Sequence, residues 1–320
     1  MKFVRLITTD PYYNLAVEEF LFSHTDEDVF MLWQNSPTVV IGKNQNAYAE
    51  VDLGYAEANS IKIARRITGG GAVYHDLGNI NYSYITLSGG TLDFARLSKP
   101  VISALKGIGI EAALGGRNDI LTDGKKISGS AQHTSNGRTL HHGTLLFDVD
   151  AEKMSSVLRV DKEKLEHHGV KSHKSRVTNI KELLPSYITV SDFMNTLESL
   201  IVKELSAYVT NVGDTPEINT LTERNRSREW IYSSKKLLTN YTLKRKKRYP
   251  FGSVELAIDL EGDIIKNITV TGDFFSLLPI DELENALDGR LLGDLSQIDV
   301  SNYISGMTNE DFSTLLTSAE

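Results

Sequence analysis

The chain has 320 residues, of which 40% are hydrophobic and 24% charged, and its formal net charge at pH 7 is -8. These values fit a folded globular protein with one large domain and a smaller one, and the acidic balance argues against a general nucleic-acid binder. The absence of cysteine excludes disulfides, thiolate metal sites and thioester catalysis. Because no apolar run reaches the ~20 residues that span a bilayer, and no signal peptide is evident, we expect a cytoplasmic protein without membrane contact.

The first third of the chain predicts one helix followed by strands. Asn14 is a suitable N-cap for a helix that carries an apolar stripe and ends near His24. The turn residues Asn35-Ser36-Pro37 separate two apolar strands. The elements expected here are a helix over 14–24, strands over 29–33 and 38–41, a short helix over 53–59, and strands over 61–64 and 80–86.

The rest of the chain alternates between helical and strand patterns. Asp93 is placed to cap a long helix, and Asn136-Gly137 is a strong hairpin cue. The further elements expected are a helix over 94–108, a strand over 110–114, a hairpin of 125–134 with 138–149, a helix over 191–208, a helix or loop plus helix over 216–230, a hairpin of 251–260 with 264–271, and helices over 281–287 and 309–316.

Five consecutive basic residues at 244–248 interrupt this pattern. One interpretation is a solvated linker, and the other is a docking patch that attracts an acidic partner protein. We therefore place a domain boundary near 245–250, between a large domain over 1–245 and a small one over 246–320. Residues 245–250 are our hypothesis for a hinge between them.

The stretch R-R-I-T-G-G-G-A-V-Y-H-D-L-G-N at 65–79 is the most unusual in the chain. Three glycines make positive φ accessible, so that consecutive N–H groups can converge on an anion. Arg65 and Arg66 add planar cations suited to phosphate or carboxylate. The alternative is a flexible hairpin loop beside two surface arginines. The stretch is neither a phosphate loop, since no Lys-Ser or Lys-Thr follows the glycines, nor a G-x-G-x-x-G dinucleotide motif.

Three more segments carry candidate chemistry. Asn118 and Asp119 can bind a nucleotide or magnesium, although an Asx-turn explains them equally well. Lys125 and Lys126 enter a strand beside small residues, and strand alternation allows only one of them to reach a given site. His141 and its neighbour His142 on the next strand face opposite sides for the same reason, so the pair is a poor metal site.

Together these segments resemble the lipoate–protein ligase family of the biotin/lipoate ligase superfamily. The resemblance covers most of residues 1–185, including H-G-V-K-S at 168–172 and S-R-V-T-N-I at 175–180, where Arg176 and Asn179 are expected to brace the site or start a helix. It implies an α+β fold with a large mixed-sheet catalytic domain and a small α/β C-terminal accessory domain. It also selects Lys126, at the head of K-I-S-G-S-A, over Lys125. His133 departs from relatives that carry arginine at that position.

The resemblance implies an ATP-dependent ligase that forms lipoyl-AMP from lipoate or octanoate and then acylates a lysine of an acceptor. The acceptors implied are lipoyl domains of 2-oxoacid dehydrogenase acyltransferase subunits, the glycine-cleavage H protein, or both. Lys126 is the implied catalytic residue, Glu18, Trp33 and His75 the lipoyl pocket, and Asp119 a possible Mg²⁺ contact. The residues implied to bind ATP and lipoyl-AMP are Arg66, Gly69, Gly70, Gly71, Ala72, Val73, Tyr74, Asn118, Asp119, Lys126, His142 and Thr144.

Three rival functions share this fold. An octanoyl or lipoyl transferase would work without ATP, but its thioester form needs a cysteine, which the chain lacks. A biotin ligase would carry a G-R-G-R-x-G loop in place of the glycine-rich stretch. A non-catalytic acyl-adenylate-binding relative would have no need for the complete set of Arg66, three glycines and Lys126.

Overall fold

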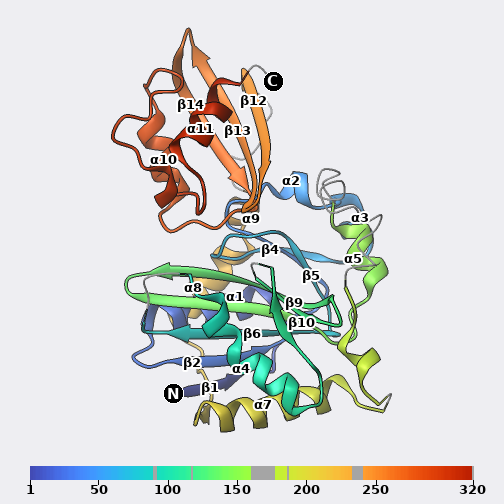
Figure 1. Ribbon diagram of the computed structural model, residues 1–320. Coiled ribbons are helices and arrows are strands. Elements are labelled where there is room, and N and C mark those ends of the chain that lie inside the picture. The colour runs from blue at the N-terminus through green and yellow to red at the C-terminus, as the bar shows by residue number, and fades with distance from the viewer. Residues whose placement is uncertain (89–91, 117, 160–176, 186, 233–240, 319–320) are drawn as a thin grey trace. The chain divides into compact units, whose positions relative to one another are not determined.

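The structure is a computed structural model that describes residues 1–88, 92–116, 118–159, 177–185, 187–232 and 241–318 (Figure 1). Arg176 and the segment 168–172, which the sequence analysis singled out, lie outside the described residues. The chain forms two compact units. The first comprises Met1–Val40, Val51–Ala64 and Val73–Ser227, and the second Ile41–Glu50, Arg65–Ala72 and Arg228–Glu320. The predicted boundary near residue 245 stays a prediction.

A mixed eight-stranded sheet forms the frame of the first unit. Its strands lie in the order β11-β1-β2-β6-β10-β9-β8-β7, with β11, β1 and β2 parallel and the remaining neighbours antiparallel. The strands are β1 (Lys2–Arg5), β2 (Val29–Trp33), β6 (Asn79–Thr86), β7 (Ala113–Gly115), β8 (Asp119–Thr122), β9 (Lys125–Ser135), β10 (Arg138–Leu146) and β11 (Tyr208–Thr210). This mixed sheet confirms the predicted α+β class.

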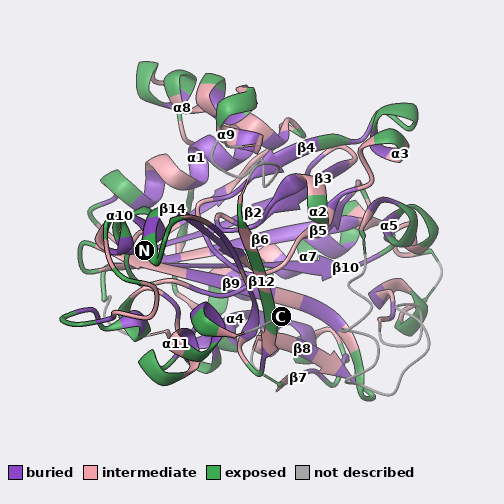
Figure 2. Ribbon diagram, turned by 90° about the horizontal axis from the view of Figure 1, so that it is seen from above, coloured by how far each residue is buried: buried purple, intermediate pink, exposed green. Residues whose placement is uncertain are grey.

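Helices cover both faces of this sheet (Figure 1). On one face α4 (Phe94–Gly107) and α7 (Val190–Glu204) bury their apolar stripes against β1, β2, β6 and β10 in one continuous core. On the other face lies α1 (Pro11–His24), with α8 (Pro216–Arg226) packed against it. Since β2 and β6 are covered on both sides, almost all their residues are buried (Figure 2).

Smaller elements complete the first unit. A second sheet has the order β4-β3-β5, in which β5 runs antiparallel to β3. Its strands and the short helices that follow in the chain are β3 (Thr38–Ile41), β4 (Lys62–Arg65), β5 (Val73–His75), α3 (Leu53–Ala58), α5 (Ala151–Val157) and the 3-10 turn η2 (Ile180–Leu183).

The start of α1 differs from the prediction. Asp10, not Asn14, is the N-cap, and its carboxylate accepts a hydrogen bond from the N–H of Tyr12. Pro11 fixes this start, because proline suits the first helical position, where its missing N–H costs nothing. Asn14 is instead fully buried within the helix, and its amide serves another contact.

The predicted hairpin is confirmed, whereas the end of one helix and the position of one strand differ from the prediction. The hairpin of β9 and β10 turns at Asn136 and Gly137, whose φ values of 51 and 73° are typical of an Asn-Gly turn. Helix α7 ends earlier than expected, because Ser206 takes a positive φ of 48° before strand β11 begins. The strand predicted at 110–114 is shifted to Ala113–Gly115.

The second unit contains an antiparallel sheet, β12-β13-β14. Helices α10 and α11 pack on this sheet in a separate hydrophobic core. Its elements are α2 (Ala47–Glu50), α9 (Arg228–Tyr232), β12 (Leu243–Tyr249), β13 (Gly252–Glu261), β14 (Ile264–Gly272), α10 (Ile280–Leu287), the 3-10 turn η4 (Val300–Asn302) and α11 (Asn309–Thr317).

The basic run at 244–248 is not a linker. It lies in β12, and every residue from Lys244 to Tyr249 pairs with a residue of β13. Sequence reasoning missed this strand because its side chains are charged, and three of them, Lys244, Lys246 and Lys247, are exposed. A hinge at 245–250 would have to break this pairing. In the described part of the chain, no helix is both long and apolar enough to cross a membrane.

Candidate functional site

The side chain of Lys126 folds back over its own strand, β9, in the first unit. Its Nζ is 2.8 Å from Oδ1 of Asp119 on β8, and Asp119 pairs with Gly129 of β9. A Cβ on Gly129 would stand 2.8 Å from that Nζ and 3.0 Å from Cε. The glycine of K-I-S-G-S-A therefore leaves the space that this ammonium occupies. Lys125, its neighbour, is exposed.

Asn118 and Thr144 form hydrogen bonds with the part of β9 that follows Lys126. The amide nitrogen of Asn118 donates to the carbonyl of Ser130, whose Oγ donates to the carbonyl of Asn118 at 2.9 Å. Oγ1 of Thr144 on β10 accepts from the N–H of Gly129 at 3.4 Å. Asn118 thus braces the turn before β8 against β9 through a contact distant in the chain, which differs from the local Asx-turn that its sequence offered as an alternative.

A connected row of buried polar groups lies beneath α1. Both carboxylate oxygens of Glu18 contact Nδ1 of His142, at 2.9 and 3.0 Å, and Glu18 is only 1% exposed. Oγ of Ser83 donates to Glu18 at 2.5 Å and accepts from Nε1 of Trp33 at 2.9 Å. Glu18, His142 and Trp33, which were predicted separately, are therefore linked through Ser83, which was not predicted.

His75 extends this row from the small sheet. Its ring meets that of Trp33 edge-on, with centroids 6.3 Å apart, and both side chains are buried. Nδ1 of His75 lies 3.0 Å from Nδ2 of Asn35. All three residues of the predicted lipoyl pocket, Glu18, Trp33 and His75, thus lie in one contiguous group.

His141 faces the opposite side of the sheet from His142, as strand alternation predicts. Its Nε2 lies 3.3 Å from Oγ of Ser98, and its Nδ1 lies 2.9 Å from the amide of Gln132. Burial, and secondly the neighbouring His142, lower the pKa of His141 to about 3, so it is neutral and structural. The part of the chain that the structure describes contains no cluster of three residues suited to hold a metal ion.

The glycine-rich stretch is divided between the two units. Arg66, Gly69, Gly70, Gly71 and Ala72 belong to the second unit, whereas Val73 and Tyr74 open β5 in the first.

Both arginines of this stretch are buried, so their interpretation as surface residues is wrong. Arg66 turns back on the loop, where its Nε donates to Oγ1 of Thr68 at 2.9 Å and its Nη2 to the carbonyls of Gly69 and Gly71, each at 2.8 Å. Burial, and secondly Arg66, lower the pKa of Arg65 to about 10. The Arg65 guanidinium donates to five backbone carbonyls, those of Gly42, Lys43, Gln45, Trp230 and Ile231.

Close packing within the second unit requires two of the glycines. A Cβ on Gly69 would stand 2.4 Å from the carbonyl oxygen of Phe274, and Gly70 has a φ of 87°. The N–H of Gly70 donates to that same oxygen at 3.2 Å. The N–H of Gly70, one of those that the sequence predicts to bind an anion, is therefore already hydrogen-bonded to a backbone carbonyl.

Asn179 and His133, which the sequence analysis also singled out, each contact a neighbouring part of the chain. Asn179 forms two hydrogen bonds of 3.0 Å with the backbone of Val149, so it braces the chain after β10 and caps nothing through its side chain. His133 packs its ring 5.5 Å from that of Phe22. Sequence reasoning missed the contacts of Ser83 and Asn35, because a serine in a strand and an asparagine in a turn carry no distinctive signal.

Two protein-family models match this chain. Residues 10–201 match the model of the lipoyl protein ligase A/B catalytic domain, and residues 239–316 match that of the bacterial lipoate protein ligase C-terminus. The chain is 39% identical to lipoate-protein ligase LplJ of Bacillus subtilis, over 96% of this chain and 97% of that one.

Two solved structures are also similar. P. falciparum LipL1 in complex with lipoate has a TM-score of 0.74 and 25% identity, covering 91% of this chain and 90% of its own. A lipoate-protein ligase A bound with ATP has a TM-score of 0.62 and 27% identity, covering 73% of this chain and 99% of its own. Both similarities include the large mixed sheet.

Proposed function

The chain belongs to the lipoate–protein ligase family, and from this premise we propose that it joins lipoate to acceptor proteins in two ATP-dependent steps. In the first step a carboxylate oxygen of lipoate attacks the α-phosphorus of ATP. A P–O bond forms to the acyl group, the bond to the β-phosphate oxygen breaks, and pyrophosphate leaves with that electron pair. The similarity to ligases that bind lipoate and ATP supports this assignment.

The position of Lys126 is the observation that carries the proposal. Its ammonium extends over Gly129 and pairs with the carboxylate of Asp119, and the lysine side chain is about a third exposed. A cation there can stabilise negative charge on the acyl and phosphate oxygens as the pentavalent state forms. The glycine beside it leaves the space in which this ammonium lies.

The buried row from Glu18 to His75 is our proposal for the lipoyl pocket. Trp33 supplies a flat apolar wall, while Ser83 accepts from its N–H and is itself held by donating to Glu18. A pocket of this kind is mostly apolar and contains a few fixed polar groups, as a dithiolane on a fatty chain requires. Octanoate has the same chain without the ring, so we propose that it is a second substrate.

Magnesium is assigned to the substrate and not to a resident site. Asp119 is one carboxylate paired with a lysine, and the described residues offer no cluster of three ligands around it. Mg²⁺ commonly binds through substrate phosphates and only one or two carboxylates. It would therefore arrive with ATP and neutralise the polyphosphate beside Lys126 and Asp119.

In the second step the ε-amine of an acceptor lysine attacks the acyl carbon. The C–N bond forms, the C–O bond to AMP breaks, and the amine loses a proton. Lipoate–protein ligases act on lipoyl domain acceptor proteins. We propose that this chain modifies the lipoyl domains of 2-oxoacid dehydrogenase acyltransferase subunits, the glycine-cleavage H protein, or both.

Isotope exchange between ATP and pyrophosphate tests the proposal, since only an adenylating enzyme catalyses it. We expect exchange that requires lipoate and proceeds without an acceptor protein. A transferase that works without ATP, or a protein that only binds the adenylate, would show none. Acyl transfer in the absence of ATP would replace the proposal with the transferase.

A further inference from the structure

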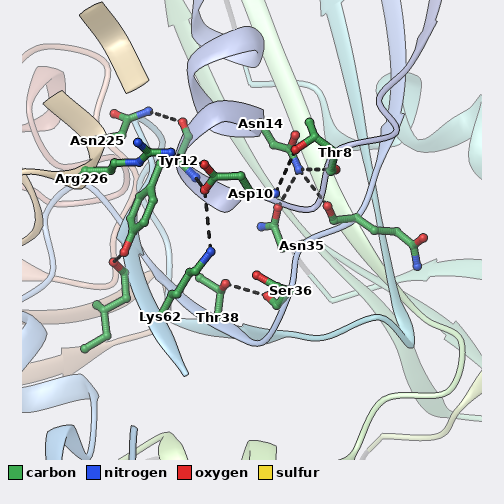
Figure 3. Close-up of polar contacts among 12 residues, drawn as sticks. Thr8, Asp10, Tyr12, Asn14, Asn35, Ser36, Thr38, Lys62, Asn225 and Arg226 are labelled. Carbon is green, nitrogen blue, oxygen red and sulfur yellow. Dashed lines mark hydrogen bonds and ion pairs between the residues drawn. The ribbon is translucent and has the colours of Figure 1, made fainter. Parts of the chain in front are cut away.

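A line of buried amides lies behind the proposed lipoyl pocket. Asn14 of α1 and Asn35 after β2 are both fully buried. Nδ2 of Asn14 lies 3.1 Å from the carbonyl oxygen of Thr8, 2.8 Å from that of Gln34, and 3.0 Å from Oδ1 of Asn35 (Figure 3). The other end of the Asn35 amide, Nδ2, lies 3.0 Å from Nδ1 of His75.

Chemistry fixes the orientation of both amides. Backbone carbonyls can only accept hydrogen bonds, so the atom of Asn14 that faces the carbonyls of Thr8 and Gln34 must be the nitrogen. This nitrogen can only donate, so the atom of Asn35 beside it must be the oxygen. The nitrogen of Asn35 is thereby left facing His75, and neither amide can be flipped without opposing two like groups.

The same reasoning continues into the imidazole ring. Because the nitrogen of Asn35 donates, Nδ1 of His75 must accept and cannot carry a proton. A proton on Nδ1 would set two donors against each other at 3.0 Å in a buried place, which leaves buried polar groups unsatisfied. The ring is therefore neutral, with its proton on Nε2.

We propose that Asn35 is a positioning residue that holds His75 as the neutral Nε2–H tautomer for binding the lipoyl chain. This inference rests on the proposed function, because it takes His75 as part of the lipoyl pocket. An uncharged ring beside Trp33 keeps this wall of the pocket compatible with an apolar chain. A positive charge there would have to be desolvated each time the chain entered. The backbone carbonyls of Thr8 and Gln34 thus set the protonation of His75 through two side chains.

The direct test is ¹⁵N NMR of the free protein with labelled histidine. The chain has 8 histidines, and the resonances that vanish in His75→Gln identify those of His75. We expect a proton-bearing Nε2 and a proton-free, acceptor Nδ1 at neutral pH. A protonated Nδ1, or an imidazolium, would overturn the inference. This measurement needs no substrate and no catalysis. If the chain shows no ligase activity, the proposed function is contradicted, but the assignment of the His75 tautomer is not affected.

The variant Asn35→Asp tests the consequence for substrate. Its carboxylate keeps the shape and still accepts from Asn14, but toward His75 it can only accept, so Nδ1 must gain a proton. We expect His75 to become Nδ1-protonated and the KM for lipoate to rise about tenfold, with the KM for ATP within about twofold. Asn195→Asp, the same substitution at an exposed residue of α7 where the carboxylate still accepts from Arg5, should change neither.

Two results would contradict this account. One is an unchanged His75 tautomer in Asn35→Asp. The other is an altered tautomer with the KM for lipoate within twofold of wild type, which would remove the link to the lipoyl chain. If Asn35→Asp does not fold, Asn14→Ala replaces it, because Asn35 could then turn its amide and His75 should show both tautomers. A single tautomer in Asn14→Ala would count against the inference.

Discussion

Lys126 and Asp119 form an ion pair of 2.8 Å between two neighbouring strands, and the lysine reaches it across the bare backbone of Gly129. The pair is about one-third exposed, so it contributes little to stability, on the order of 1 kcal/mol or less. The ion pair instead positions Lys126, because it holds this flexible side chain in one place before substrates bind.

Gly129→Ala should displace Lys126 without unfolding the protein. The added Cβ would meet only the far end of the lysine, which can move away. We expect pyrophosphate release to slow about tenfold, or about 1.4 kcal/mol, while the melting temperature changes by only a few degrees. Gly213→Ala is the matched control, since nothing lies within 4 Å of its Cβ position. Equal rates in the two variants would contradict the role given to this glycine.

Arg65→Lys should destabilise the second unit. The guanidinium makes hydrogen bonds to five buried or partly buried carbonyls, whereas an ammonium has three donors and cannot reach them all. We expect the free energy of unfolding in urea to fall by about 3 kcal/mol. Arg228→Lys, at an exposed arginine, should cost less than about 0.5 kcal/mol. A loss below about 1 kcal/mol at position 65 would show that the carbonyls find other donors.

His141 should make the protein less stable in acid. Its pKa is about 3 in the folded chain and 6.5 ordinarily, so below pH 6.5 the unfolded chain binds a proton that the folded chain rejects. This contribution is fully present above pH 6.5 and is lost as the pH falls toward 3. Between pH 7 and pH 5 the loss is about 2 kcal/mol.

Urea unfolding at several pH values measures this effect. His141→Gln should be less stable than wild type at pH 7 but should lose less stability between pH 7 and pH 5. His24→Gln, at an exposed position, should keep the wild-type slope. Parallel slopes for wild type and His141→Gln would mean that His141 is protonated in the folded state.

The basic strand β12 offers a test of acceptor docking. Lys246→Glu with Lys247→Glu reverses two exposed charges, which should weaken electrostatic attraction to an acidic lipoyl domain. We expect transfer to the acceptor to slow about tenfold at low salt, with pyrophosphate release unchanged. The same reversals at Lys106 and Lys203, also exposed, serve as the control. If both double variants transfer at the wild-type rate, β12 takes no part in docking.

The sequence predicted those parts of the fold that local chemistry decides. The β9–β10 hairpin follows from Asn136 and Gly137, which adopt positive φ readily, and α4 follows from Asp93 and its apolar spacing. It failed where tertiary structure overrides local preference. Asn14 has the chemistry of a helix cap but is used as a buried amide, and the charged residues of β12 form a strand because β13 pairs with them.

The candidate site was predicted unevenly for a similar reason. Motif residues such as Lys126 could be found from the sequence because their type and spacing are unusual. Ser83 and Asn35 could not, since a serine in a strand and an asparagine in a turn are ordinary. Only the fold shows that one joins Trp33 to Glu18 and that the other faces His75.

The most direct test of the account compares two adjacent lysines in lipoate-dependent pyrophosphate release. Lys126→Ala should lower the rate by about 10²-fold or more, near 3 kcal/mol of transition-state stabilisation, whereas Lys125→Ala, at the exposed neighbour, should stay within about twofold of wild type. A Lys126→Ala rate within about threefold of wild type would contradict the central claim that this ammonium stabilises the adenylation transition state.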